Sequence, residues 1–128
     1  DLVLCSTARR AWRTWQLASA ALDAVPATVG CDELYLAEVP RMIDVVRRRG
    51  GVTPRLLLVG HNPGMHGLAN SLVTAGVAVD RTRLAAKFPT AGLAWIRLPI
   101  ASWADLQAGS GELMGFWSPR DLAGTTVP

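Results

Sequence analysis

His61 is the residue of this sequence whose surroundings most clearly suggest chemistry. It follows the apolar run Leu56–Val59, which has the length and composition of a buried parallel strand, and it opens the segment His61-Asn62-Pro63-Gly64. This order of residues predicts a tight corner between a strand and a helix. Because ligands of open α/β sheets bind outside the carboxyl ends of the strands, we expect His61 to be functional.

The residues after His61 add a second anion-binding feature to this corner. Pro63 suits the first helical position, where its missing N–H would have no partner, and Asn62 can cap free amides. The remaining amides and the positive end of the helix dipole would then face an anion beside the imidazole. A purely structural reading, in which His61 is tolerated in a turn and Gly64 meets a backbone need, explains this corner equally well.

A second strand-to-helix corner lies at the start of the sequence. Leu2–Cys5 is a short apolar strand, Ser6 and Thr7 are favourable helix caps, and we expect the following helix to extend to about Leu22. Apolar residues recur along this helix at helical spacing: Ala11, Trp15, Ala18 and Leu22.

Three arginines, Arg9, Arg10 and Arg13, fall in or near the first turn of this second helix. In a parallel sheet the two corners lie at the same edge, so an arginine fork and His61 could converge on one dianion. We expect Arg13 and one of the other two arginines to lie on a solvated helix face instead.

The order and spacing of these motifs resemble the histidine phosphatase superfamily, the phosphoglycerate mutase-like proteins, and within it the small SixA-type phosphohistidine phosphatases. The resemblance extends over nearly the whole chain. The motifs that carry it are Ser6-x-x-x-Arg10 with Thr14, Glu33-Leu34, Val59–Gly64, Lys87–Gly92 and Trp117–Leu122.

The resemblance implies a phosphatase that works through a phosphohistidine intermediate. Arg10 would then clamp the phosphoryl oxygens, and His61 would stabilise charge on the transferred group. Ser6 and Asn62 complete the phosphate-binding set that we predict. The substrate would be a phosphohistidine protein or another small phosphorylated compound, and we expect no metal or organic cofactor.

Glu33 falls where some relatives in this superfamily keep an acidic residue that protonates the leaving group. We therefore include it among the candidate catalytic residues. Asp32 and Glu38 lie close by, and an ordinary loop carboxylate is the favoured reading for all three residues.

The Arg-His-Gly signature, whose histidine is the nucleophile in this superfamily, does not occur in the sequence. The second histidine, His66, lies about 140° from His61 around the same predicted helix and cannot replace it. We expect a first strand and helix of roughly 30 residues or more to precede Asp1 and to carry the nucleophile. The alternative is a short form that binds a phosphorylated ligand without cleaving it.

The two cysteines, Cys5 and Cys31, are expected to be reduced and buried. Cys5 ends a strand, which raises the possibility of a cysteine-dependent phosphatase. That class requires five residues between the cysteine and an arginine, and the residue at the required position is Ala11. We therefore set this mechanism aside.

Composition predicts one compact domain, residues 1–128, with half of its residues hydrophobic and a net charge of +3. The most basic run, Arg47–Arg49 before two glycines, suits the end of a helix better than a nucleic-acid surface. We expect no nucleic-acid partner and no membrane span, and a cytoplasmic protein.

The expected fold is a three-layer α/β/α domain with a mostly parallel central sheet, phosphoglycerate mutase-like, that lacks its first strand. A strand near Val29, a helix over residues 39–49 and two late strands over residues 92–98 and 112–117, paired like a hairpin, complete it. The apolar face of the 39–49 helix is Val39, Met42, Ile43 and Val46. Of the tryptophans, Trp95 and Trp117 are expected to be buried in the core or half-buried, and Trp12 to flank the mouth of the pocket.

Overall fold

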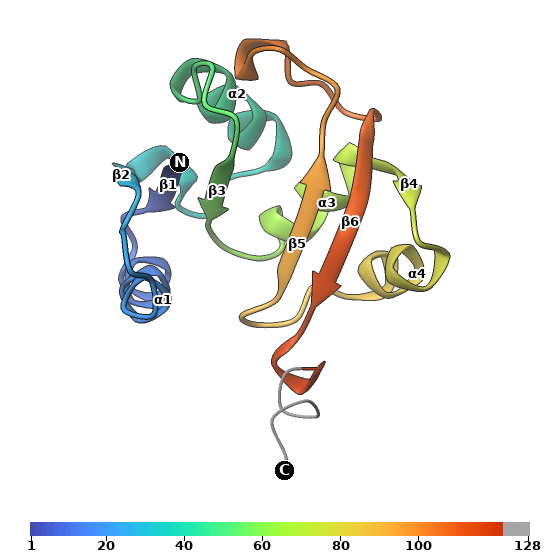
Figure 1. The fold of residues 1–128 in the computed structure, drawn as a ribbon, viewed down its shortest axis with the longest axis horizontal. Helices are drawn as coiled ribbons and strands as arrows, with labels where there is room; N and C mark the ends of the chain where they lie inside the picture. The colour runs from blue at the N-terminus through green and yellow to red at the C-terminus, as the bar shows by residue number, and fades with distance from the viewer. Residues whose placement is uncertain (122–128) are drawn as a thin grey trace.

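The computed structural model of the protein describes residues 1–121 and shows an α/β fold (Figure 1). Leu122, at the end of one of the motifs above, lies outside the described residues. The elements in chain order are β1 Leu2–Ser6, α1 Arg9–Ser19, β2 Ala27–Cys31, a 3₁₀ turn Asp32–Leu34, α2 Val39–Arg49, β3 Leu56–Val59, α3 Gly64–Leu72, β4 Val73–Gly76, α4 Ala78–Ala86, β5 Leu93–Arg97, a 3₁₀ turn Trp103–Asp105 and β6 Gly111–Trp117.

The first sheet is parallel throughout and has the order β2-β1-β3. Its central strand, β1, is covered on both faces, which explains why it is almost continuously apolar. On one face, Val3 and Cys5 pack with Ala11 and Trp15 of α1. On the other face, Leu4 belongs to the main core, whose other fully or nearly buried members include Cys31, Leu34, Met42, Val45, Val46, Leu68, Leu72 and Leu106.

The second sheet has the order β4-β6-β5, with β4 parallel and β5 antiparallel to β6. One of its faces packs against α3 and α4, where Leu84, Leu113 and Phe116 are buried together with Ala69. The hairpin-like pairing expected for the two late strands is confirmed. Figure 1 shows β3 and β6 running in the same direction, with β5 opposed to both.

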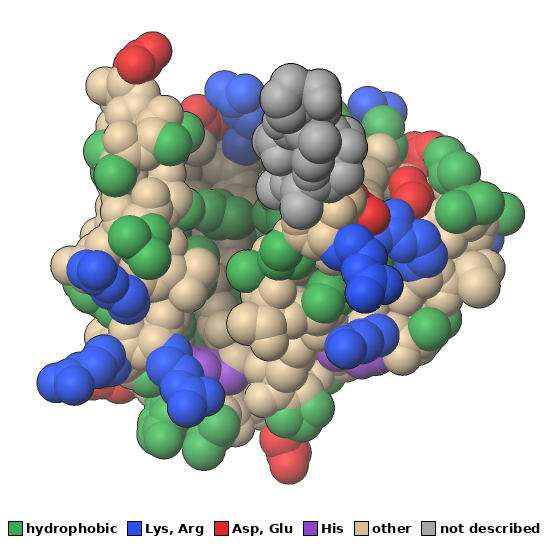
Figure 2. Space-filling view, turned by 90° about the horizontal axis from the view of Figure 1, so that it is seen from below, with side chains coloured by type: hydrophobic (Ala, Val, Ile, Leu, Met, Phe, Trp, Pro, Cys, Tyr) green, Lys and Arg blue, Asp and Glu red, His purple; other side chains and the backbone are tan. Residues whose placement is uncertain are grey.

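The strands form two separate sheets rather than the single central sheet that the sequence predicts, because β3 and β5 each end their own sheet and are not paired with one another. An apolar groove lies between these two edges. Cavities of about 480 and 160 Å³ lie along it, and both are lined by Leu56, Leu57 and Ile96. Figure 2 shows the molecule hollowed between its two halves.

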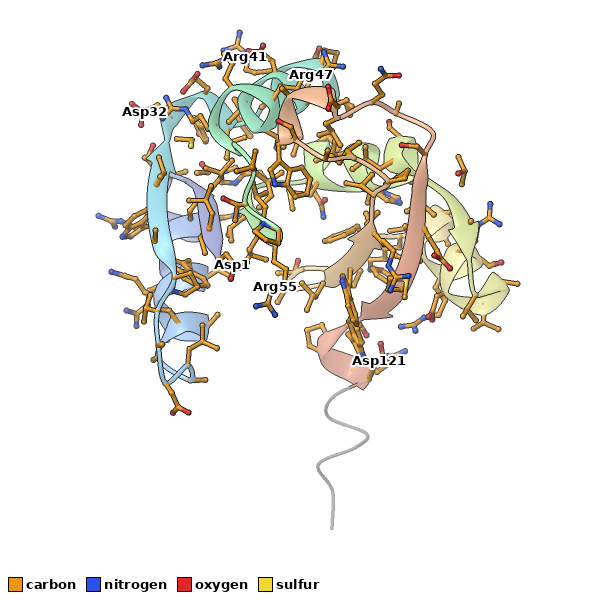
Figure 3. All side chains as sticks on the ribbon, turned by 45° about the horizontal axis from the view of Figure 1, so that its top comes forward. Asp1, Asp32, Arg41, Arg47, Arg55 and Asp121 are labelled. Carbon is orange, nitrogen blue, oxygen red and sulfur yellow. The ribbon has the colours of Figure 1, made fainter. Side chains whose placement is uncertain are left out.

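The open groove changes the surroundings of β3 and β5. All four residues of β3 are only half-buried, although they form an uninterrupted apolar run. On β5, Leu93 is 48% and Trp95 57% exposed, so the expectation that Trp95 is buried in the core or half-buried is wrong. Trp117 on β6 is 37% exposed. Asp1 and Arg55 form an exposed ion pair beside this groove (Figure 3).

Among the described residues, the helices are all too short and too polar to cross a membrane. The helix α1 ends at Ser19 rather than near Leu22, because the amides of Ala21 and Leu22 donate three residues back, to the carbonyls of Ala18 and Ser19, in a tighter turn. Ala18 and Leu22 are consequently exposed, contrary to the predicted apolar face.

Candidate functional site

An open pocket of about 750 Å³ lies at the carboxyl ends of β1 and β2 and next to the end of β3. The residues that line it are Thr7, Ala8, Arg9, Arg10, Asp32, Tyr35, Leu36 and His61. The two predicted corners therefore meet, and Arg10 and His61 share one pocket. Figure 2 looks onto this edge and shows cationic side chains close to both histidines.

The register of β1 against β3 explains how His61 reaches this pocket. Cys5 is paired with Val59, so Ser6 and the corner after β3 lie side by side at the sheet edge. The hydroxyl of Ser6 lies 2.8 Å from Nε2 of His61. Ser6 is completely buried and also accepts the amide of Ala8 at 3.3 Å. It does not line the pocket, and its hydroxyl contacts the imidazole of His61 instead.

Asn62 also acts on the corner rather than on the pocket. Its side-chain oxygen accepts the amide of His66 at 3.2 Å, which confirms the predicted capping, and its side-chain nitrogen donates to the carbonyl of Phe88 at 2.8 Å. Asn62 is not among the pocket-lining residues. The helix α3 begins at Gly64, one residue later than predicted, with Pro63 as its cap residue.

The three arginines at the start of α1 differ in their position relative to the pocket. Arg9 and Arg10 both line the pocket, whereas Arg13 does not. Both pocket arginines are exposed. We expected either Arg9 or Arg10 to lie on a solvated helix face instead of at the site. This prediction is wrong, because both residues line the pocket. Thr7, predicted as a helix cap, instead donates its hydroxyl to Asp32, and the cap position of α1 is Ala8.

The structure does not bring Glu33 to this pocket. Glu33 forms ion pairs with Arg48 at 2.6 Å and with Arg49 at 3.1 Å, near the end of α2. The hydrogen bond from Arg48 lowers the pKa of Glu33 from its ordinary value, which disfavours the protonated form that a general acid requires. Asp32, one residue earlier and labelled in Figure 3, is the carboxylate that lines the pocket.

The two remaining candidate residues, His66 and Trp12, lie away from the pocket. His66 is half-buried, with Nε2 2.6 Å from the carbonyl of Leu84, so it ties α3 to α4. Trp12 is not at the pocket mouth as expected, because it packs against the cluster between β1 and α1. Among residues 1–121, no group of three or more His, Cys, Asp or Glu side chains could hold a metal ion.

Cys5 and Cys31 are free and buried, as predicted. Desolvation by burial raises the pKa of the Cys5 thiol to about 11, and it also raises the pKa of Cys31. A thiol with a raised pKa carries little thiolate at neutral pH and is a poor nucleophile. The two side chains also lie on opposite faces of the sheet, Cys5 with α1 and Cys31 in the main core.

Comparisons with known proteins bear on this site. No protein-family model matches the chain. Two proteins of Mycobacterium tuberculosis, both called uncharacterized, are each 40% identical to it over 122 residues: MT1313 of strain CDC 1551 / Oshkosh and Rv1276c of strain ATCC 25618 / H37Rv. The match covers 94% of this chain and 74% of each relative, so about a quarter of each relative lies outside it.

Two solved structures have a similar fold. They are provisionally assigned as SixA phosphohistidine phosphatases, one from Nakamurella multipartitia and one from Agrobacterium tumefaciens, with TM-scores of 0.75 and 0.69 and identities of 25% and 28%. Each match covers 93% of this chain and 70% or 68%, respectively, of the other. The chain therefore belongs to the family of these two mycobacterial proteins and has the histidine phosphatase-like α/β fold of the SixA structures.

Proposed function

We propose that the protein is a phosphatase of the histidine phosphatase superfamily that acts on a phosphohistidine protein or another small phosphorylated substrate. The observation that carries this proposal is the convergence of Arg10 and His61 on one open pocket at the carboxyl ends of neighbouring parallel strands. A guanidinium and an imidazole held at such an edge can bind and stabilise a phosphoryl dianion.

In this proposal the pocket residues stabilise the phosphoryl group and do not attack it. Arg10, with Arg9 beside it, holds the phosphoryl oxygens, while His61 stabilises the charge that builds up in the transition state. Asp32 replaces Glu33 as our candidate for protonating the leaving group, because Asp32 lines the pocket and Glu33 is engaged by two arginines.

The nucleophile in this proposal is a histidine from a segment outside these 128 residues. Its imidazole nitrogen bonds to phosphorus as the bond to the leaving atom breaks, and water then cleaves the phosphohistidine to release phosphate. The groove between β3 and β5 supports this part of the proposal. It is apolar and lies between two strand edges that pair with no other strand of residues 1–121, so it can accept a further strand whose carboxyl end would reach the His61 corner.

The exposed side of β5 gives the same proposal a second support. Leu93 and Trp95 are large apolar side chains that stand on an uncovered strand, and a helix that follows the added strand would cover them. The length of such a strand and helix, roughly 30 residues or more, is compatible with the quarter of each mycobacterial relative that lies outside the match.

The alternative function is a module that binds a phosphorylated ligand without cleaving it. The position of His66 favours this reading for residues 1–128 taken alone, because its ring nitrogen is bonded to Leu84 and it does not line the pocket. His61 is the one histidine at the pocket among the described residues.

Single-turnover phosphate release from an aryl phosphate and from a phosphohistidine protein tests the proposal. We expect no turnover by residues 1–128 and robust turnover by a longer natural form. In the longer form, His61→Ala and Arg10→Ala should each lower kcat by about 10²-fold or more, as loss of a transition-state charge stabiliser does.

A crystal structure with phosphate or vanadate provides the complementary measurement. We expect the anion to lie between Arg10 and His61. Arg13→Ala is the matched control and should still bind the anion, because Arg13 lies on the same helix as Arg10 but not in the pocket. Robust activity of residues 1–128 that survives His61→Ala would show that the chemistry lies in other residues. A longer form that binds the anion but releases no phosphate would favour the binding module.

A further inference from the structure

Two large apolar side chains form part of the wall of the phosphate pocket and are not packed away. Tyr35 is 59% and Leu36 65% exposed, and both line the pocket together with Arg10 and His61. Exposed single apolar residues are common on protein surfaces. Two adjacent ones at the rim of a cationic pocket are different, because they border the space that a ligand in the pocket would fill.

The backbone holds these two side chains outward. Leu34, almost fully buried, anchors the end of the 3₁₀ turn, and the amide of Ala37 donates to its carbonyl at 3.3 Å. Between them, Leu36 has a φ of 49°, in the left-handed region that non-glycine residues seldom occupy. Strained backbone of this kind persists only where the surrounding structure holds it, and it clusters at ligand-binding sites.

Tyr35 stands directly beside the residue that we assign to charge stabilisation. Its ring packs edge-to-face against His61, with ring centroids 5.5 Å apart and an interplanar angle of 75°. The ring of Tyr35 and the side chain of Leu36 therefore form a wall next to the position of a bound phosphoryl group. A leaving group that extends from that phosphorus toward solvent meets this wall.

Two polar groups next to this wall are engaged with each other, since the hydroxyl of Thr7 donates to a carboxylate oxygen of Asp32. Sugar hydroxyls placed against the apolar surfaces of Tyr35 and Leu36 would lose water without compensation, which disfavours them there. An aromatic ring, in contrast, can pack on Tyr35 and Leu36.

We propose that Tyr35 and Leu36 form a leaving-group subsite that selects phosphorylated substrates with a flat aromatic or imidazole leaving group over sugar phosphates. This inference rests on the proposed function and specifies its substrate class. Its test uses two phosphonates that share a dianionic head and resist hydrolysis: phenylphosphonate, which carries a ring, and methylphosphonate, which does not.

Calorimetric titration of the full-length protein with each phosphonate measures the preference. We expect phenylphosphonate to bind about tenfold more tightly than methylphosphonate, because one aromatic contact and the apolar area that it buries contribute about that much to the affinity. Tyr35→Ala and Leu36→Ala should each reduce this preference several-fold and leave the Kd for methylphosphonate within about twofold. Leu17→Ala is the control, because Leu17 is 62% exposed on α1 and does not line the pocket.

Leu36→Gly separates the role of the side chain from that of the backbone. Glycine adopts a φ of 49° without strain, so this variant should unfold at a temperature no lower than Leu36→Ala and should still lose the preference. In the active form, Tyr35→Ala should lower kcat/KM for phenyl phosphate by about tenfold and that for a hexose phosphate by less than about twofold.

The outcomes separate this inference from the proposed function. Equal binding of both phosphonates by the wild-type protein, or a preference that survives Tyr35→Ala and Leu36→Ala, would overturn the subsite and leave the anion pocket intact. Failure to bind either phosphonate would refute the anion pocket itself, and the subsite with it.

Discussion

The hydroxyl of Ser6 joins the end of β1 to the pocket histidine, and its removal has a calculable effect on stability. In the Ser6→Ala variant, the imidazole of His61 and the amide of Ala8 both lose a partner at a completely buried position. One net hydrogen bond is worth about 1 kcal/mol, and a buried group left unpaired costs about 1 to 3 kcal/mol. Because His61 is only half-buried, water can replace part of the loss, and we expect the lower end of this range.

A double-mutant cycle isolates the contact between Ser6 and His61 from other effects of the substitutions. We expect Ser6→Ala and His61→Ala to show a coupling free energy of about 1 kcal/mol, which is within the range for residues in direct contact. Urea unfolding followed by tryptophan fluorescence measures it in the full-length protein. In the active form, Ser6→Ala should also lower kcat by about tenfold, less than His61→Ala, because it displaces the imidazole without removing it.

Ser71→Ala provides the control for this cycle. The hydroxyl of Ser71 donates to the carbonyl of Gly67 at 2.8 Å within α3, so it makes a bond of similar length on the helix that follows His61. Ser71→Ala and His61→Ala should be additive within about 0.5 kcal/mol. If Ser6→Ala and His61→Ala were additive to the same degree, the inference that Ser6 positions the imidazole would be refuted.

Two further predictions concern Cys5 and the acidic residues. Cys5→Ser in an active form should change turnover by no more than a few fold, since the raised pKa of this thiol disfavours the thiolate, and a loss of several orders of magnitude in a folded variant would revive a cysteine mechanism. Glu33→Gln should lower the unfolding midpoint in urea at neutral pH, whereas Asp32→Asn should instead lower turnover. Because the pKa of Glu33 is lowered by folding, its stabilisation is present above its ordinary pKa and disappears as the pH falls through the folded value, so the two proteins should converge in stability in acid. A Glu33→Gln effect on stability that persists in strong acid would contradict this assignment.

The sequence predicts an element well where the spacing of its apolar residues and the residue types at its ends indicate the same structure. The helix α2 has the predicted bounds, because apolar residues at helical spacing end in three arginines and Gly50. The helix α4 was not predicted. Only Leu84 is buried along its length, so it carries almost no periodic signal, and no side chain caps its start. Its short neighbour β4 was missed for a similar reason, since Gly76 and two exposed residues leave no run of apolar positions.

The site shows the same division between local and long-range information. The corner at His61 could be predicted because glycine, asparagine and proline determine the conformation of the backbone next to them. Its proximity to Arg10 could be predicted because parallel strands have their carboxyl ends at the same edge of the sheet. The separation of Asp32 from Glu33 could not, because it depends on the arginines at the end of α2, 15 and 16 residues further along the chain. The rim of Tyr35 and Leu36 was also missed. Its only trace in the sequence is the pair Tyr35-Leu36 shortly after Asp32 and Glu33.

The edge of β3 that faces the groove, which no strand among residues 1–121 pairs with, has a consequence for how the protein behaves in a cell. An apolar strand with free amides and carbonyls along one side is a template to which a strand of any other chain can bind, and proteins normally cover, shorten or charge such edges. Here the edge consists of three consecutive leucines and a valine, with no charge or proline among them. A strand that bound along this edge would therefore also protect the protein against edge-to-edge association.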